Sequence, residues 1–306
     1  MREEEELKSE LRSEVSYLEL LKIAKKRGLQ REPRSQERII DWLLQDGLTW
    51  REYELNYNPY IALKLRICKF FGIKKGWKIM DIGCGSGGTS ATAASLVGSG
   101  GKVLAIDKSE EEIRRCNNYI RKVRFEEIIE TKVANIFDLQ LEGDHFDIVL
   151  LLYSPQFLGY FGDLREVLLR IRKWTARVGI ADHVPVPGKH DESIYILYNW
   201  LNNDVARLSA GDKTDRLFHP EEIRNALSTT GWDIVRERRF KVSKKNVWPE
   251  WAMKDNIERL SRQIETLKDP VHKEILSSRL QTIEKLTQKQ LMPKPTSMFA
   301  ALAEAR

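Results

Sequence analysis

The sequence predicts an α/β protein with a doubly wound parallel sheet, and three observations support this prediction. Apolar runs typical of strands alternate with amphipathic runs typical of helices from residue 77 to residue 240. The run HFDIVLLLY at 145–153 is apolar almost throughout, as in a parallel strand buried on both faces. A glycine-rich stretch separates the first strand signal from the helix that follows it. The 306 residues, 42% of them hydrophobic, suffice for a large core with additions.

Helices are expected before the first strand. In the first thirty residues, apolar residues recur at helical spacing among charges, and Gly28 stands where this single helix would end. A second helix is expected at 35–47 with Ser35 as its N-cap, and a third begins at Asn58 and Pro59. Residues 1–56 are therefore interpreted as an N-terminal helical cover.

The alternating part of the chain comes next. Strands are expected at 78–83, 101–107, 127–136, 145–153, 176–182, 232–240 and 297–305. Helices are expected at 86–98, 109–123, 163–174 and 219–231. In the second of these helices, Ser109 is the expected N-cap and an acidic first turn follows it, which favours a helix start there.

A helical hairpin is expected between the last two strands, within residues 241–295. Apolar residues at helical spacing over 249–267 and again from Val271 flank a break at 268–270, which reads KDP. Residues 241–294 contain twelve Lys or Arg against seven Asp or Glu. The hairpin has two interpretations that remain open, a lid over a site or a surface through which a homodimer forms.

Composition excludes several classes of protein. The cysteines Cys68, Cys84 and Cys116 lie far apart without paired spacing, so neither a disulfide framework nor a metal site is expected. The N-terminal stretch is charged throughout, and no apolar run approaches the ~20 residues that span a bilayer. We expect a cytoplasmic protein without a membrane span. The net charge of +6 permits an acidic partner without requiring one.

The stretch MDIGCGSGGTS at 80–90 is the most informative motif. A glycine-rich turn between a strand and a helix places backbone N–H groups at the carboxyl edge of the sheet, where ligands of open α/β sheets bind. Two cofactor patterns overlap in it: a dinucleotide pattern formed by Gly83, Gly85 and Gly88, and an S-adenosylmethionine (SAM) pattern formed by Asp81, Gly83, Gly85 and Gly87. The glycines alone leave both cofactors open.

Three neighbouring features favour SAM. The carboxylate of Asp81 suits a ligand with a cationic amino-acid end, whereas it would repel a pyrophosphate. Asp107 ends the second strand, where an acidic side chain accepts both hydroxyls of a ribose, and this serves either cofactor. In the stretch VANIFDL at 133–139, Asn135 and the backbone of Ile136 can bind an adenine edge while the Ile136 side chain covers the ring.

With these motifs the sequence resembles the class I, Rossmann-like, SAM-dependent methyltransferases. The resemblance covers about residues 57–240 and 296–305, and it rests on MDIGCGSGG, Asp107, ANI and HFDIVLLLY in that order. It implies a seven-stranded sheet whose last strand is antiparallel. Residues 57–240 and 296–306 would then form the SAM-binding catalytic domain, with S-adenosylhomocysteine (SAH) as a product. The expected cofactor-binding residues are Asp81, Gly83, Cys84, Gly85, Ser86, Gly87, Asp107, Lys108, Asn135 and Ile136.

Residues at the ends of the fourth and fifth strands are expected to face the methyl acceptor. Tyr153 ends the fourth strand and is expected to line the acceptor pocket. The next residues, SPQF at 154–157, approach a motif of enzymes that methylate planar amino groups, although Gln156 replaces a proline. His183 follows the fifth strand, where its near-neutral pKa suits a general base, and Asp182 beside it can orient it or hold substrate. Tyr153 and His183 are therefore the candidate catalytic residues.

Three functions remain open on the sequence alone. The first is a methyltransferase that acts on a small or medium-sized molecule, because the N-terminal helices and the hairpin resemble covers around a site. The second is a methyltransferase that acts on a protein or nucleic acid, which the basic insert and SPQF favour. The third is a non-catalytic SAM-binding assembly protein. The aromatic residues Tyr195, Tyr198 and Trp200 either cover the acceptor pocket or pack between helices.

Overall fold

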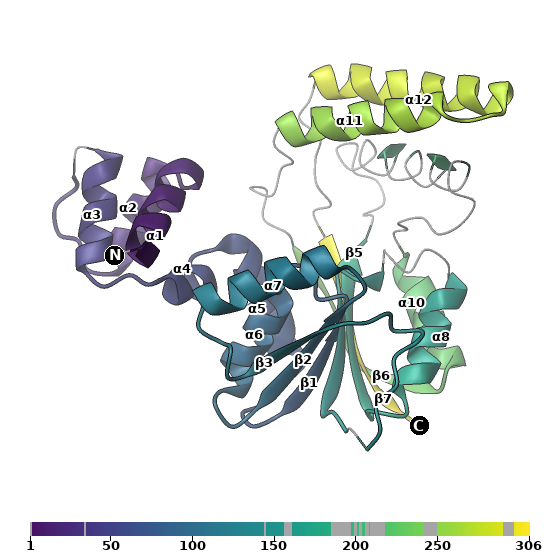
Figure 1. The fold of residues 1–306 in the computed structure, drawn as a ribbon, viewed down its shortest axis with the longest axis horizontal. Helices are drawn as coiled ribbons and strands as arrows, with labels where there is room; N and C mark the ends of the chain where they lie inside the picture. Colours follow the sequence, from purple (N-terminus) through teal and green to yellow (C-terminus); the bar gives the residue numbers. More distant parts are fainter. Residues whose placement is uncertain are drawn as a thin grey trace.

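The computed structural model describes most of the chain, namely residues 2–33, 35–143, 145–155, 161–184, 197–198, 201, 204–205, 208, 218–241, 250–289 and 297–306. Seven strands form one sheet in the order β3-β2-β1-β4-β5-β7-β6 (Figure 1). These strands are β1 (Lys78–Ile82), β2 (Lys102–Asp107), β3 (Ile129–Val133), β4 (Ile148–Leu152), β5 (Arg177–His183), β6 (Trp232–Lys241) and β7 (Ser297–Ala305). β7 runs antiparallel to both β5 and β6, and the four other strand pairs are parallel, which confirms the predicted fold class.

Helices cover both faces of the sheet, as a doubly wound fold requires (Figure 1). One core cluster joins the sheet to α5 (Pro59–Phe70), α6 (Gly88–Val97) and α7 (Glu110–Lys122). A second cluster joins the opposite face to α8 (Phe161–Ile171) and α10 (Pro220–Thr229). All five residues of β4 are buried between these layers, in agreement with the apolar run that predicted it.

The N-terminal helices form a small core of their own, visible at the left of Figure 1. They are α1 (Arg2–Glu14), α2 (Tyr17–Lys26), α3 (Gln36–Gln45) and α4 (Trp50–Asn56). The prediction of one helix over the first thirty residues was wrong, because a new helix starts after Ser16. The backbone N–H and the hydroxyl of Ser16 both donate to the Glu19 carboxylate, at 3.3 and 2.9 Å, and this capping box begins α2.

Among the helices that precede β1, two starts agree with the sequence and one was not expected. Ser35 accepts a hydrogen bond from the N–H of Arg38, and Asn58 accepts from the N–H groups of Tyr60 and Ile61, so both act as predicted N-caps. The short helix α4 was missed, although Thr49 caps it by accepting from the N–H of Glu52.

The hairpin between β6 and β7 consists of α11 (Glu250–Glu265) and α12 (Pro270–Lys289), broken where KDP predicted. Its core includes Tyr198, Leu201 and Val205, and Arg279 forms an ion pair with Asp204 at 2.8 Å. Figure 1 shows both helices beyond the edge of the sheet at which β5 ends. Among the helices that the structure describes, none has the length and apolar character needed to cross a membrane.

Candidate functional site

The glycine loop connects β1 to α6 at the carboxyl edge of the sheet. Gly83, Gly85 and Gly87 have φ of 70°, 51° and 90°, in the left-handed region that side chains disfavour. The N–H groups of Gly83 and Cys84 donate to the carbonyl of Ile106 in β2 at 2.8 and 3.0 Å. The loop is therefore held against the neighbouring strand in one conformation.

Two of these glycines also sit where no side chain fits. A Cβ at Gly83 would lie 2.7 Å from Cβ of Ser154, which follows β4. A Cβ at Gly87 would lie 2.7 Å from Sγ of Cys116 in α7. Since both contacts are closer than carbon and sulfur atoms allow, the loop needs glycine at these positions for close backbone approach as well as for its φ angles.

Asp81 lies beneath the loop and is completely buried. Its Oδ2 accepts a hydrogen bond from the Ser90 hydroxyl at 2.6 Å, whereas its Oδ1 has no hydrogen-bond partner among the residues that the structure describes. Burial raises the pKa of the Asp81 carboxyl to about 6, although the Ser90 hydrogen bond and the nearby Lys64 charge oppose the shift. A buried carboxylate oxygen without a partner is unfavourable unless a ligand supplies a donor.

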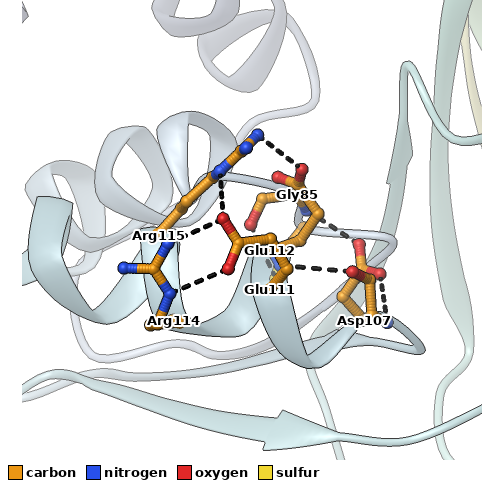
Figure 2. A network of polar contacts seen from close by, with 8 residues as sticks. Gly85, Asp107, Glu111, Glu112, Arg114 and Arg115 are labelled. Carbon is orange, nitrogen blue, oxygen red and sulfur yellow. Dashed lines mark hydrogen bonds and ion pairs between the residues drawn. The ribbon is translucent and has the colours of Figure 1, made fainter.

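Asp107 ends β2 and braces the loop from the side (Figure 2). Its Oδ2 accepts from the N–H of Gly85 at 3.0 Å, and its Oδ1 accepts from the N–H of Ser109 at 2.9 Å. Ser109 in turn caps α7 by accepting from the N–H of Glu112, as predicted. Each carboxylate oxygen has more than one lone pair, so the Asp107 carboxylate can also accept hydroxyl groups of a ligand.

The surface of α7 beside this network carries its own ion pairs (Figure 2). Glu111 pairs with Arg114 and Arg115 at 2.7 and 3.0 Å, and Arg115 also reaches Glu112 at 3.1 Å. The Arg114 hydrogen bond holds the pKa of the exposed Glu111 carboxyl down, at about 2. Glu112 connects these pairs to the Asp107 network, because its backbone N–H donates to the Ser109 hydroxyl.

Four other expected cofactor residues differ in their surroundings. Ser86 and Lys108 are exposed on the loop and after β2. Cys84 is buried, and its contact with Cys116 together with burial raises the pKa of its thiol, so the thiol stays protonated. Asn135 accepts from the N–H of Phe137 and donates to Asp138, at 3.2 and 3.1 Å, so its amide already stabilises a turn.

Ile136 is buried in the core cluster on the α8 side, at the start of that turn. Its side chain therefore packs against the core of the protein. The roles expected for Asn135 and Ile136 at an adenine ring stay predictions.

The two candidate catalytic residues lie together. The rings of Tyr153 and His183 meet edge to face, with centroids 5.2 Å apart, at the ends of β4 and β5. Tyr153 has a φ of 61°, which is unusual for an aromatic residue and typical of functional sites. Burial raises the pKa of the Tyr153 hydroxyl, so it stays protonated at neutral pH. The Asp182 carboxylate accepts from the backbone N–H of His183 at 2.7 Å.

Two site residues were missed by the sequence interpretation, and both come from α5. The Tyr60 ring lies 5.7 Å from the Tyr153 ring, and the Lys64 ammonium lies over both, 4.7 and 5.2 Å from the two ring centroids. The signal for Lys64 was present in the sequence, because it shares helical spacing with the buried Ile61 and Ile67 and therefore lies on the apolar face of the helix.

Several expectations fall partly outside the described residues. Gln156 and Phe157 of the SPQF stretch lie outside them, as do Tyr195 and Trp200. Ser154 and Pro155 are described and buried. Tyr198 is buried in the core of the hairpin, where Arg259 donates to its hydroxyl at 3.4 Å, which supports the helix-packing interpretation for that residue.

Comparisons with known proteins point to methyltransferases. Residues 73–218 match a family model described as a methyltransferase domain. A sterol 24-C-methyltransferase of Kluyveromyces lactis is 23% identical over 186 residues, which is 59% of this chain and 45% of that protein. A 2-phytyl-1,4-naphtoquinone methyltransferase of Synechococcus elongatus is 27% identical over 129 residues, 42% of this chain and 55% of that protein. The chain thus spans about half the length of these curated relatives.

Solved structures share the fold. A cyclopropane-fatty-acyl-phospholipid synthase-like protein from Lactobacillus casei superposes with a TM-score of 0.66 at 18% identity, covering 84% of this chain and 94% of that one. The YcgJ protein of Bacillus subtilis superposes with a TM-score of 0.52 at 13% identity, covering 80% of this chain and 99% of that one.

Proposed function

Because residues 73–218 form a class I, Rossmann-like, SAM-dependent methyltransferase domain, we propose that this chain binds SAM at the carboxyl edge of its sheet and transfers the methyl group to a small or medium-sized acceptor. The observation that carries the proposal is the pair of acidic residues on either side of the glycine loop. Asp81 lies below the loop with one oxygen lacking a partner, and Asp107 braces it from the side.

The residues around the loop fit the cofactor. The unpartnered Oδ1 of Asp81 supplies negative charge for an α-ammonium group, and the glycines leave room for close approach of a ligand to the backbone. Asp107 retains lone pairs for the ribose hydroxyls. Asn135 and Ile136 would hold the adenine, and Gly83, Gly85 and Gly87 would hold the methionine end.

When bound, SAM supplies a methyl group already activated by its sulfonium, so the task of the chain is to position the acceptor and to exclude water. Tyr153 and His183 line the acceptor side. Where the acceptor must lose a proton, the His183 imidazole is the group with a suitable pKa range. The protonated Tyr153 hydroxyl would act as a hydrogen-bond donor to the acceptor.

The acceptor that the site favours is apolar. The relatives named above act on a sterol and on a phytylated naphthoquinone, both of which are lipophilic. On the acceptor side of this chain, the Tyr153 ring contacts the rings of Tyr60 and His183, and Tyr60 is 42% exposed. Aromatic surface of this kind binds apolar rings and chains.

The experiment supplies purified protein with SAM labelled in its methyl group. One reaction contains a mixture of sterols and prenylated quinols, and a parallel reaction contains a mixture of proteins and RNA. We expect the label in the lipid fraction. Label in protein or RNA alone would contradict the proposed acceptor class, and SAM binding without transfer in either reaction would favour a non-catalytic role.

A further inference from the structure

Lys64 is a buried cation beside the glycine loop. Its side chain belongs to α5, and the residue is only 7% exposed. The cap at Asn58 fixes the first turn of this helix, so the position of Lys64 is set by the backbone. Burial of a lysine is unfavourable unless other groups stabilise its charge. The groups around Lys64 therefore indicate its function.

The surroundings stabilise the charge only in part. The ammonium lies over the rings of Tyr60 and Tyr153, and each cation–π contact contributes modestly. Among the residues that the structure describes, no carboxylate lies within ion-pair distance of the Lys64 ammonium. A lysine this buried, without an anionic partner, is suited to an anion from outside the chain.

The ammonium also lies at the start of α6. A Cβ at Gly88, the first residue of that helix, would be 2.9 Å from Nζ of Lys64. The N-terminal N–H groups of a helix attract anions, and the lysine charge adds to this effect. Asp81 is near enough for the Lys64 charge to influence its pKa. The Lys64 ammonium and the Asp81 carboxylate therefore lie close to each other at the glycine loop.

We propose that Lys64 binds the α-carboxylate of SAM. This inference rests on the proposed function and deepens it, since a free amino-acid end carries both a carboxylate and an ammonium group. Lys64 and the start of α6 receive the carboxylate, while Oδ1 of Asp81 receives the ammonium. The opposite charges of the two side chains then select a zwitterion over a pyrophosphate, which would suit Lys64 but meet repulsion from Asp81.

Calorimetry with two ligands tests the inference. One is SAH, and the other is the SAH analogue in which hydrogen replaces the α-carboxylate. The wild-type protein should bind SAH about 10- to 100-fold more tightly than the analogue, because the analogue lacks the carboxylate that would form a charged hydrogen bond with Lys64. In Lys64→Met this preference should fall to within about threefold. The control Lys69→Met changes an exposed lysine of the same helix and should keep the wild-type preference.

The outcomes separate the inference from the proposed function. If the wild-type protein binds both ligands equally, Lys64 does not bind the carboxylate, whether or not the variant folds. If Lys64→Met keeps the full preference for SAH, the inference is likewise wrong while SAM binding stands. If the wild-type protein binds neither ligand, the proposed function itself fails.

Discussion

The backbone N–H of Gly85 donates a 3.0 Å hydrogen bond to the Asp107 carboxylate, which joins the glycine loop after β1 to the end of β2 (Figure 2). The same carboxylate accepts from Ser109 at the start of α7. Asp107 thus fixes the loop before any ligand binds. A ribose would meet a carboxylate whose direction is already set, which lowers the entropy lost on binding.

Replacing Asp107 should abolish tight cofactor binding. In Asp107→Ala, the loop loses its brace and the ribose loses its acceptor, so we expect the Kd for SAH to rise at least about 100-fold. Isothermal titration calorimetry measures this. The control Glu111→Gln alters the neighbouring ion pairs on α7 and should leave the Kd within about twofold. Equal effects of the two substitutions would contradict the role of Asp107.

Asp81 should lower the stability of the free protein at neutral pH. Its pKa of about 6 in the folded protein lies above the ordinary value of 3.8, so the folded state binds the proton more tightly. The proton bound to Asp81 stabilises the folded state fully below about pH 4. This stabilisation, about 3 kcal/mol, is lost as the pH rises through about 6.

The substitution Asp81→Asn should remove this pH dependence. Relative to the wild type, the free energy of unfolding of the variant should increase between about pH 4.5 and about pH 7.5, as measured by urea denaturation. SAH binding should weaken in the same variant, because the ammonium loses its partner. A variant with unchanged SAH affinity would show that Asp81 serves the fold alone.

Gly83 should tolerate no side chain. In Gly83→Ala, the new Cβ meets Ser154 at 2.7 Å and the φ of +70° adds strain, so we expect a loss of about 2 to 4 kcal/mol in urea denaturation. Gly76→Ala is a matched control, since its φ is +80° but no atom of the described part of the chain would lie within 4 Å of the new Cβ. That control should cost about 1 to 2 kcal/mol. Equal losses would mean that the contact with Ser154 is not tight.

His183 should act on the acceptor side only. Its ring contacts Tyr153 at the ends of β4 and β5, away from the brace at Asp107. We therefore expect His183→Ala to leave the Kd for SAH within about threefold while methyl transfer to the acceptor falls. Calorimetry and the labelled-methyl assay measure the two quantities. A loss of SAH affinity above about tenfold would place His183 in the cofactor half of the site instead.

Much of the fold was predictable because local signals and burial agree. Ser35, Asn58 and Ser109 cap helices as their positions indicated, and the apolar run at 145–153 contains a strand buried on both faces. The break at Ser16 was missed because apolar residues continue at helical spacing across it. The signal lay in Ser16 and Glu19, whose S-x-x-E spacing is that of a capping box.

The cofactor half of the site was more predictable than its remaining parts. The glycine pattern and the strand-end acids are encoded within short stretches, whereas Lys64 comes from α5, which precedes β1 in the chain. A lysine in a helix is usually exposed, and its burial here depends on the missing Cβ of Gly88 and on the rings of Tyr60 and Tyr153. Such an arrangement exists only once the chain is folded.

Calorimetry with SAH and with NADH decides which cofactor this chain binds, because both cofactors suit a glycine loop followed by a strand-end acid. We expect SAH to bind and NADH not to bind, since Asp81 disfavours a pyrophosphate. We also expect Asp107→Ala to lose tight SAH binding. Preferential binding of NADH, or SAH affinity that Asp107→Ala leaves unchanged, would contradict the assignment of the glycine loop to SAM.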